Sequence, residues 1–271
     1  MEYCSNFFAE MERTRPAAPG PGRGPENLVL VRSVTSTNQL ARAIVAEYEQ
    51  EAQHLQPLLL LAREQTGGRG RQGRSWSSPP GRGVYATRVL AVESTELLQS
   101  LPLLVGAGLC RGLAPHLAMP CGLKWPNDLV VETPAGRKKI GGILIEALVR
   151  PGEPTSAILG FGINHGHDES ELPATGTSLR LLAQGVPPPS LGQLTWDLVG
   201  ALERELEHLG DVPYAVAAYR EHTVHRPGDA ISCRVGDGVV EGRFKGFDER
   251  GRLLLERDGE ELCLPAGEVI E

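Results

Sequence analysis

The segment from Glu64 to Ser78, EQTGGRGRQGRSWSS, restricts the possible folds of this chain more than any other stretch. It follows an apolar run, Leu58 to Ala62, that predicts a buried strand. Its four glycines and three arginines bring backbone amides and guanidinium groups onto one short loop. That combination suits a phosphate or a carboxylate, because glycine allows close approach and arginine offers a fixed fork of donors. Trp76 then offers a flat face for a nucleobase.

Two common nucleotide-binding folds do not fit this loop. Gly68, Gly70 and Gly73 satisfy the dinucleotide pattern G-x-G-x-x-G, but Pro79 and Pro80 lie where its helix should begin, and they oppose a helix. A phosphate-binding P-loop would need a Lys-Ser or Lys-Thr pair after the glycines, and there is none. Taken alone, a Gly/Arg run favours a solvated, flexible loop, so its meaning depends on the rest of the chain.

Four further motifs accompany the loop and together carry a resemblance. They are STNQ at Ser36–Gln39, KWPNDL at Lys124–Leu129, KIGGILIE at Lys139–Glu146 and GFGIN at Gly160–Asn164. With GRGRQGRSW, and in this order, they resemble the bacterial biotin protein ligase family from about Leu28 to the C-terminus. Several independent motifs in one order are far more specific than any one of them.

The pattern of apolar runs mixes strands and helices without strict alternation, which predicts an α+β fold. The resemblance implies a mixed sheet flanked by helices, like that of class II synthetases, as a catalytic domain over residues 28–222. From about residue 223, short strands and tight turns such as Asp258-Gly259 predict a β-meander, which the family carries as a small SH3-like barrel. Residues 1–27 end in a Pro/Gly-rich run, and we expect a disordered tail there.

Charge and cysteine content exclude several other classes. The net charge of -7 disfavours general binding to DNA, so the arginines of the loop form a local site. The five cysteines form no C-x-x-C pair, which fits a reduced cytoplasm. No signal peptide is evident at the N-terminus, and we expect no run long enough to cross a membrane. We therefore expect a cytoplasmic protein that binds neither membranes nor DNA.

The resemblance also implies roles for individual residues. The biotin-binding set would be Ser36, Thr37, Asn38, Gln65, Gly68, Arg69, Gly70, Arg71, Lys139 and Gly142. The ATP-binding set would be Arg71, Arg74, Trp76, Asn127 and Asn164. Lys139, Arg69 and Arg71 would be catalytic, and Asp128 would be a ligand of Mg²⁺. Plain alternatives remain for three of these groups: helix capping by Ser36 with Gln39, an ordinary turn at Pro126–Asp128, and a solvated pair Lys138–Lys139.

The implied reaction activates biotin with ATP to biotinyl-5′-adenylate and transfers it to a lysine of a biotin carboxyl carrier protein. An anionic carboxylate must approach an anionic phosphate, so such a site needs fixed cations more than a base. Gln72 and Ser75 depart from the basic residues common at those positions. Residues 1–27 are too few for the winged helix-turn-helix of bifunctional members, so the resemblance is to the monofunctional branch of the family. We expect a monomer or a homodimer.

Two rival functions stay open on the sequence. One is a lipoate or octanoyl ligase of the same superfamily, which shares the adenylate chemistry. The other is a non-catalytic nucleotide- or DNA-binding regulator.

We further expect every site residue to precede Gly166, which leaves the C-terminal module to dock the acceptor protein. We also expect the Gly/Arg loop to be mobile until a ligand binds.

Overall fold

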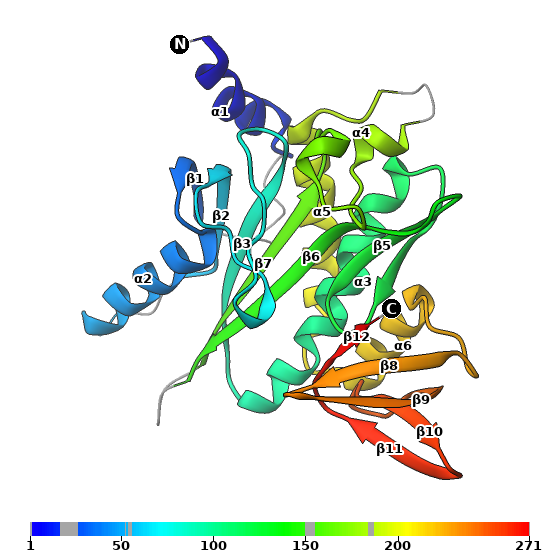
Figure 1. Ribbon diagram of the computed structural model, residues 1–271. Helices are drawn as coiled ribbons and strands as arrows, with labels where there is room; N and C mark the ends of the chain where they lie inside the picture. The colour runs from blue at the N-terminus through cyan, green and yellow to red at the C-terminus, as the bar shows by residue number, and fades with distance from the viewer. Residues whose placement is uncertain are drawn as a thin grey trace.

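The computed structural model describes residues 2–16, 27–51, 53, 56–149, 155–183 and 187–270. These residues form a seven-stranded mixed sheet and a separate five-stranded antiparallel sheet, seen at the lower right of Figure 1. The strands of the larger sheet are β1 (Asn27–Val34), β2 (Leu58–Gln65), β3 (Gly83–Val92), β4 (Cys121–Lys124), β5 (Asp128–Thr133), β6 (Gly136–Leu148) and β7 (Thr155–Asn164).

The larger sheet has the order β1-β2-β3-β7-β6-β5-β4. Only the β1–β2 pair is parallel, and the helix α2 (Thr37–Gln50) connects those two strands. All other neighbours in this sheet are antiparallel. The predicted α+β class with a mixed sheet is therefore confirmed.

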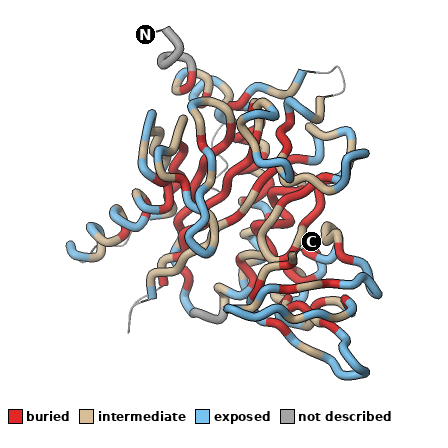
Figure 2. The backbone as a smooth tube through the Cα atoms, in the orientation of Figure 1, coloured by how far each residue is buried: buried red, intermediate tan, exposed pale blue. Residues whose placement is uncertain are grey.

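Helices cover both faces of the larger sheet, as the alternation along β2 shows. Leu58 and Leu60 join a small core cluster with Ala41 and Val45 of α2. Leu59 and Leu61 point the other way, into the main core. Because the first five residues of β2 are buried on both faces, Leu58–Ala62 is a continuous apolar run (Figure 2).

The main core lies between the sheet and two long helices. These are α3 (Leu101–Leu113) and α5 (Leu191–Leu206), and the shorter helices are α4 (Leu179–Leu182) and α6 (Val212–His222). In the described part of the chain, one helical stretch, Leu97–His116, is long and apolar enough to cross a membrane, contrary to our expectation from sequence. Since 67% of its apolar window is buried inside the protein, it is a core helix.

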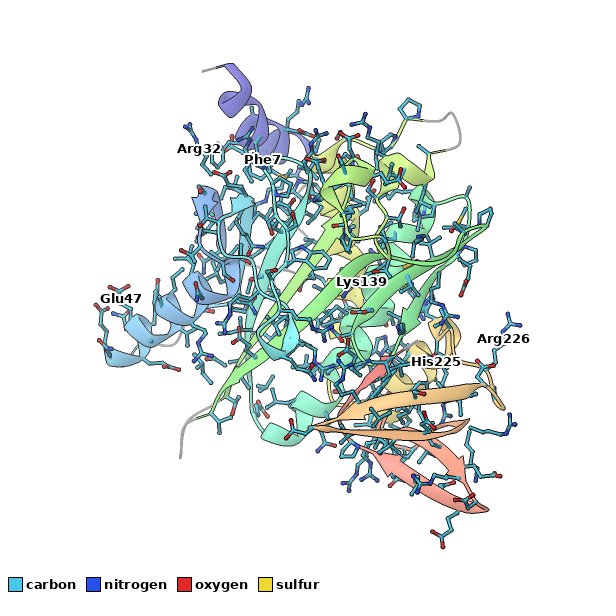
Figure 3. All side chains as sticks on the ribbon, viewed as in Figure 1. Phe7, Arg32, Glu47, Lys139, His225 and Arg226 are labelled. Carbon is cyan, nitrogen blue, oxygen red and sulfur yellow. The ribbon has the colours of Figure 1, made fainter. Side chains whose placement is uncertain are left out.

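The N-terminus differs from the predicted disordered tail. Glu2–Thr14 forms the helix α1, and Phe7 and Met11, one helical turn apart, are buried in the main core (Figure 3). Two polar contacts fix α1 on α5: Trp196 Nε1 donates to the Met11 carbonyl at 2.9 Å, and Gly192 N donates to Glu10 Oε1 at 2.8 Å. The burial of Phe7 and Met11 therefore outweighs the conformational entropy that is lost when this helix is ordered, although a Pro/Gly-rich run follows it. Residues 17–26 of the predicted tail lie outside the described residues.

The smaller sheet is the expected SH3-like domain, with strand order β11-β10-β9-β8-β12. Its strands are β8 (Ala230–Val235), β9 (Gly238–Phe247), β10 (Leu253–Arg257), β11 (Glu260–Leu264) and β12 (Glu268–Ile270). Asp258 and Gly259 both have positive φ (56° and 82°) and join β10 to β11 in a tight hairpin. The domain packs beside the β4 edge of the larger sheet, since Val224 N donates to the Leu123 carbonyl at 3.0 Å.

Candidate active site

One cleft of about 890 Å³ collects the residues singled out from the sequence. Residues of β5, β6 and β7 line it, together with residues of the Gly/Arg loop and β12. Of all the predicted binding, catalytic and metal-binding residues, Gly68 alone does not line the cleft. The motifs are far apart in sequence, and the fold brings them to one place.

The first end of the cleft is neutral and lies at the N-terminus of α2. Ser36 occupies the N-cap position, but its side chain makes no capping hydrogen bond, so the predicted capping box with Gln39 is wrong. Instead, Thr37 donates from its backbone N and from Oγ1 to Gln65 Oε1, at 2.9 and 3.1 Å. Gln65 Nε2 in turn donates to Ser78 Oγ at 2.9 Å. A side chain of β2 therefore satisfies the helix terminus that Ser36 was expected to cap.

Asn38 is the most heavily bonded residue at this neutral end. The residue is 3% exposed, and its Nδ2 donates to the Leu144 carbonyl at 3.1 Å and to Glu146 Oε2 at 2.9 Å. Its Oδ1 accepts from Thr87 Oγ1 at 2.7 Å. A buried polar network with its partners in place holds one geometry, so this end of the cleft is rigid.

The Gly/Arg loop folds back on itself as a small hairpin. Gly70 N donates to the Arg74 carbonyl at 2.7 Å, and Trp76 N donates to the Gly68 carbonyl at 2.9 Å. A Cβ on Gly68 would lie 2.4 Å from the Trp76 carbonyl oxygen, so only glycine fits where the two arms cross. At the tip, Gln72 has a positive φ of 54°. The hairpin directs Arg69, Arg71 and Arg74 toward the cleft.

Trp76 covers the floor of the cleft. A Cβ on Gly162 would lie 2.5 Å from Trp76 Nε1, so the glycine of β7 leaves the space that the indole fills. Lys139 Nζ lies 5.5 Å from the centre of the indole ring, within cation–π range. Trp76 Nε1 is buried against β7 and has no hydrogen-bond partner among the described residues. A buried donor without a partner is costly, so the indole is held here by its packing.

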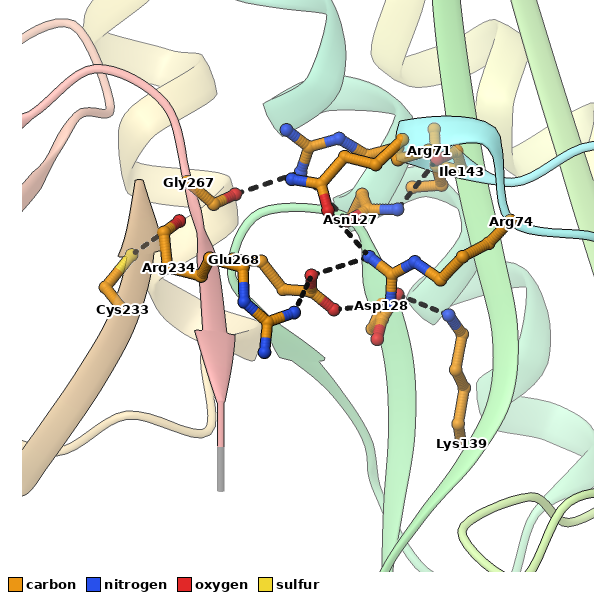
Figure 4. A network of polar contacts seen from close by, with 11 residues as sticks. Arg71, Arg74, Asn127, Asp128, Lys139, Ile143, Cys233, Arg234, Gly267 and Glu268 are labelled. Carbon is orange, nitrogen blue, oxygen red and sulfur yellow. Dashed lines mark hydrogen bonds and ion pairs between the residues drawn. The ribbon is translucent and has the colours of Figure 1, made fainter. Parts of the chain in front are cut away.

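The second end of the cleft is cationic and centres on Lys139 (Figure 4). Lys139 Nζ lies 2.6 Å from Asp128 Oδ1, and Asn127 Nδ2 donates to the Ile143 carbonyl at 2.9 Å. Arg71 Nη1 donates to Asn127 Oδ1 at 3.2 Å. Lys139 therefore faces the cleft and pairs with an acid, which rules out a merely solvated pair with Lys138.

The turn at Asn127 and Asp128 is more than a connection between β4 and β5. Both of its polar side chains face the cleft and hold the cations of the second end. No group of three or more His, Cys, Asp or Glu within the described ranges could hold a metal ion by itself. Asp128 thus offers one carboxylate, which suits Mg²⁺ only where substrate phosphates supply further ligands.

The C-terminal domain forms one side of the cationic end, which sequence reasoning missed. Arg74 donates from Nη1 and Nη2 to the two carboxylate oxygens of Glu268, at 2.7 and 2.6 Å, and Arg71 Nη1 donates to the Gly267 carbonyl at 3.2 Å (Figure 4). Arg234 also lines the cleft, with Glu268 and the two residues that follow it. The expectation that all site residues precede Gly166 is therefore wrong.

Burial and charge at this seam shift three pKa values. Burial lowers the pKa of the Arg71 guanidinium, although Glu268 and Asp128 oppose that shift. The hydrogen bond that Arg74 donates to Glu268 raises the pKa of Arg74. Burial favours a higher pKa for Glu268, but the hydrogen bond and the charge of Arg74 outweigh it, so the pKa of Glu268 is lowered. The Arg74–Glu268 pair is thus fully charged at neutral pH.

The remaining predicted residue, Asn164, lies at the far wall of the cleft. Its Nδ2 donates to the Thr177 carbonyl at 2.9 Å, and its side chain is buried. Thr177 N in turn donates to the Lys139 carbonyl at 2.8 Å, so this wall is tied to β6. One of the two amide N–H donors of Asn164 is therefore engaged within this wall, and the residue lines the cleft.

Comparison with known proteins identifies both domains. Residues 30–164 match the biotin/lipoate A/B protein ligase family, and residues 228–270 match the biotin protein ligase C-terminal domain. The biotin–[acetyl-CoA-carboxylase] ligase of Mycobacterium tuberculosis is 31% identical over 93% of this chain and 91% of its own length. The ligase of the same name from Paracoccus denitrificans is 30% identical, over 78% of this chain and 88% of its own length.

The fold has a matching relative among solved structures. The biotin protein ligase of Aquifex aeolicus, solved in complex with biotin and ATP, superimposes with a TM-score of 0.70. The match covers 90% of this chain and 98% of that one, at 24% sequence identity. Identity, coverage and both domain matches agree, and the chain belongs to the biotin protein ligase family.

Proposed function

We infer that this protein activates biotin with ATP to biotinyl-5′-adenylate and then transfers the biotinyl group to a lysine of a carboxyl carrier protein. Two of the relatives described above are named biotin–[acetyl-CoA-carboxylase] ligase, and the Aquifex aeolicus ligase was solved with biotin and ATP. The observation that carries the proposal is the single cleft with a neutral polar end and a cationic end. Such a cleft suits a ligand whose uncharged head is joined by a short chain to a carboxylate and then to phosphate.

At the neutral end, Ser36, Thr37 and Asn38 would hold the biotin head, with Gln65 beside them. These groups are uncharged, like the urea group of biotin, and they already lie in fixed positions. The fixed network favours one orientation of the head, which sends the valeryl chain toward Lys139.

At the cationic end, the first bond-making step would take place. A carboxylate oxygen of biotin attacks the α-phosphorus of ATP, the bond to the bridging oxygen breaks, and pyrophosphate leaves. Negative charge spreads over the equatorial oxygens of the α-phosphate during this step. Arg69, Arg71 and Lys139 would stabilise that charge, and Lys139 would exchange its contact with Asp128 for one with the ligand.

The adenosine and the metal complete the proposal. Trp76 would face adenine, Asn127 and Asn164 would take polar contacts, and Arg74 would meet phosphate. Asp128 would hold Mg²⁺, whose charge would offset that of the phosphates of ATP. In the second step, the neutral amine of the acceptor lysine attacks the carbonyl carbon of the mixed anhydride, an amide forms, and AMP leaves.

A lipoate or octanoyl ligase is the closest rival, because the family that matches residues 30–164 includes both kinds of enzyme. The match of residues 228–270 to a biotin protein ligase domain favours biotin. A DNA-binding regulator is disfavoured by the net charge of -7. Absence of any shift of operator DNA in a gel would agree with this.

Intact-mass spectrometry tests the proposal directly. A biotin carboxyl carrier domain is incubated with this protein and Mg-ATP, and with biotin, lipoate or octanoate in parallel. We expect the mass of one biotinyl group on the carrier with biotin alone. A carrier in which the acceptor lysine is replaced by arginine is the control and should stay unmodified. Modification by lipoate or octanoate instead of biotin would establish the rival.

A further inference from the structure

The segment after α6 covers the open edge of the larger sheet. β4 is the last strand of that sheet, and Thr223 forms a parallel bridge with Leu123 of β4. Val224 N donates to the Leu123 carbonyl at 3.0 Å. A Cβ on Gly122 would lie 2.3 Å from Val224 Cγ1, so the glycine leaves space for this close approach. The chain that links the two domains therefore runs along the strand that leads into the KWPND turn.

His225, the residue after Val224, contacts the chain beyond β4 through its side chain, where the backbone pairing ends. Trp125 N donates to His225 Nε2 at 3.1 Å, and each of the two residues is only 5% exposed. An imidazole nitrogen can accept a hydrogen bond only when it carries no proton, so His225 is neutral with its proton on Nδ1. The ring of Phe244 on β9 lies 5.6 Å from the imidazole, centre to centre. This contact from the C-terminal domain helps to orient the imidazole of His225, which is labelled in Figure 3.

We propose that His225 is a positioning residue, whose Nε2 holds the start of the turn that presents Asn127 and Asp128 to ATP. Trp125 is two residues before Asn127, which contacts Arg71, and three before Asp128, which contacts Lys139. A turn fixed at its first N–H has fewer orientations in which to place those two side chains. The expected effect on ATP rests on the proposed function, whereas the hydrogen bond between Trp125 and His225 is independent of that function.

The alternative role for His225 is simple packing between the two domains. Packing depends on the volume of the side chain, whereas positioning depends on an acceptor atom in one place. His225→Gln keeps an acceptor, since the Gln Oε1 lies about as far along the side chain as Nε2. His225→Leu keeps apolar bulk and removes the acceptor. The pair of variants therefore separates the two roles.

Biotin-dependent exchange of pyrophosphate into ATP measures the effect on substrates. For His225→Leu we expect a KM for ATP raised by about tenfold, the range seen when an outer hydrogen-bond partner is lost, with the Kd of biotin unchanged within a factor of about two. For His225→Gln we expect values close to those of the unaltered protein. Equal KM values in all three proteins, or equal losses in both variants, would overturn the proposal.

A measurement on the unaltered protein tests the hydrogen bond even if a variant does not fold. Long-range ¹H–¹⁵N correlation spectra distinguish the two neutral forms of an imidazole. We expect His225 to carry its proton on Nδ1 at neutral pH, and a proton on Nε2 would contradict the proposal. If the unaltered protein makes no adenylate from biotin, the proposed function fails, while the spectra still decide the role of His225 at the turn.

Discussion

The two ends of the cleft are built in opposite ways. The neutral end is buried and satisfied within one domain: Asn38 is 3% exposed and makes hydrogen bonds to three residues of the larger sheet. The cationic end is open and spans two domains, and the side chain of Arg74 is 55% exposed and pairs with Glu268 of β12. The neutral end is already arranged before a ligand binds. At the cationic end, Lys139 and Arg74 pair with the carboxylates of Asp128 and Glu268.

This difference separates binding from catalysis. A buried network that is already in place loses little freedom when a ligand arrives, so it provides selectivity. Lys139 and Arg74 pair with Asp128 and Glu268, which hold them in position in the empty site. They can exchange those carboxylates for phosphate when a ligand binds. We therefore expect changes at the neutral end to affect stability and biotin affinity, and changes at the cationic end to affect rate.

Replacement of the central cation should have the largest effect. For Lys139→Ala we expect adenylate formation to slow by ~100-fold or more, because one lost donor to developing charge costs roughly 3 kcal/mol. Pyrophosphate exchange at saturating substrates measures this rate. Lys138→Ala is the matched control, since Lys138 Nζ contacts the Ala174 carbonyl at 2.5 Å and does not line the cleft. Near-normal exchange in the Lys139 variant would refute its catalytic role.

At the neutral end, the expected effect is on stability. Asn38→Ala leaves Thr87 Oγ1 and the Leu144 carbonyl without this partner, which should lower the free energy of unfolding by roughly 1–3 kcal/mol. Urea denaturation measures the loss, and calorimetry should show weaker biotin binding. Gln39→Ala, on the exposed side of the same helix turn, should change neither. If Lys139→Ala destabilised the protein as much as Asn38→Ala, the contrast between the two ends would be lost.

A smaller effect is expected from the contact between the domains. In Glu268→Gln the Gly/Arg loop loses the carboxylate that holds Arg74. Trypsin should therefore cut this loop several-fold faster in the empty protein. With biotinyl-adenylate bound, the rates should become equal, because the ligand then orders the loop. Glu261→Gln removes an exposed ion pair with Lys245 from the same domain and is the control. Equal cleavage of both empty variants would show that Glu268 does not hold the loop.

The smallest expected effect is the pH dependence of that same contact. The folded pKa of Glu268 is lowered relative to its ordinary value, so its contribution to stability is complete above the ordinary value and is lost as pH falls through the folded one. Because Arg74 is largely exposed, the contribution is at most ~1 kcal/mol. Urea stabilities of the unaltered protein and Glu268→Gln should therefore differ slightly at pH 7 and converge at strongly acidic pH. A difference that grew in acid would contradict this sign.

The sequence predicts most of the first domain and of the cleft, because its signals are local. Glycine spacing, arginines and the KWPND turn are visible over short windows, and the fold only has to bring them together. Glu268 and Arg234 carried no such signal, since an acid and an arginine on short strands are ordinary surface residues until the two domains meet. Phe7 and Met11 did carry a signal, their spacing of one helical turn, but the Pro/Gly-rich run after them obscured it.

A crystal structure with biotinyl-5′-adenylate bound tests the division of the cleft most directly. We predict the fused rings of biotin within hydrogen-bonding distance of Ser36, Thr37 or Asn38, and the phosphate within reach of Arg69, Arg71 and Lys139. Asp128 and Glu268 should then have lost at least one of their contacts with Lys139 and Arg74. A phosphate at the neutral end, or biotin rings among the arginines, would contradict the account.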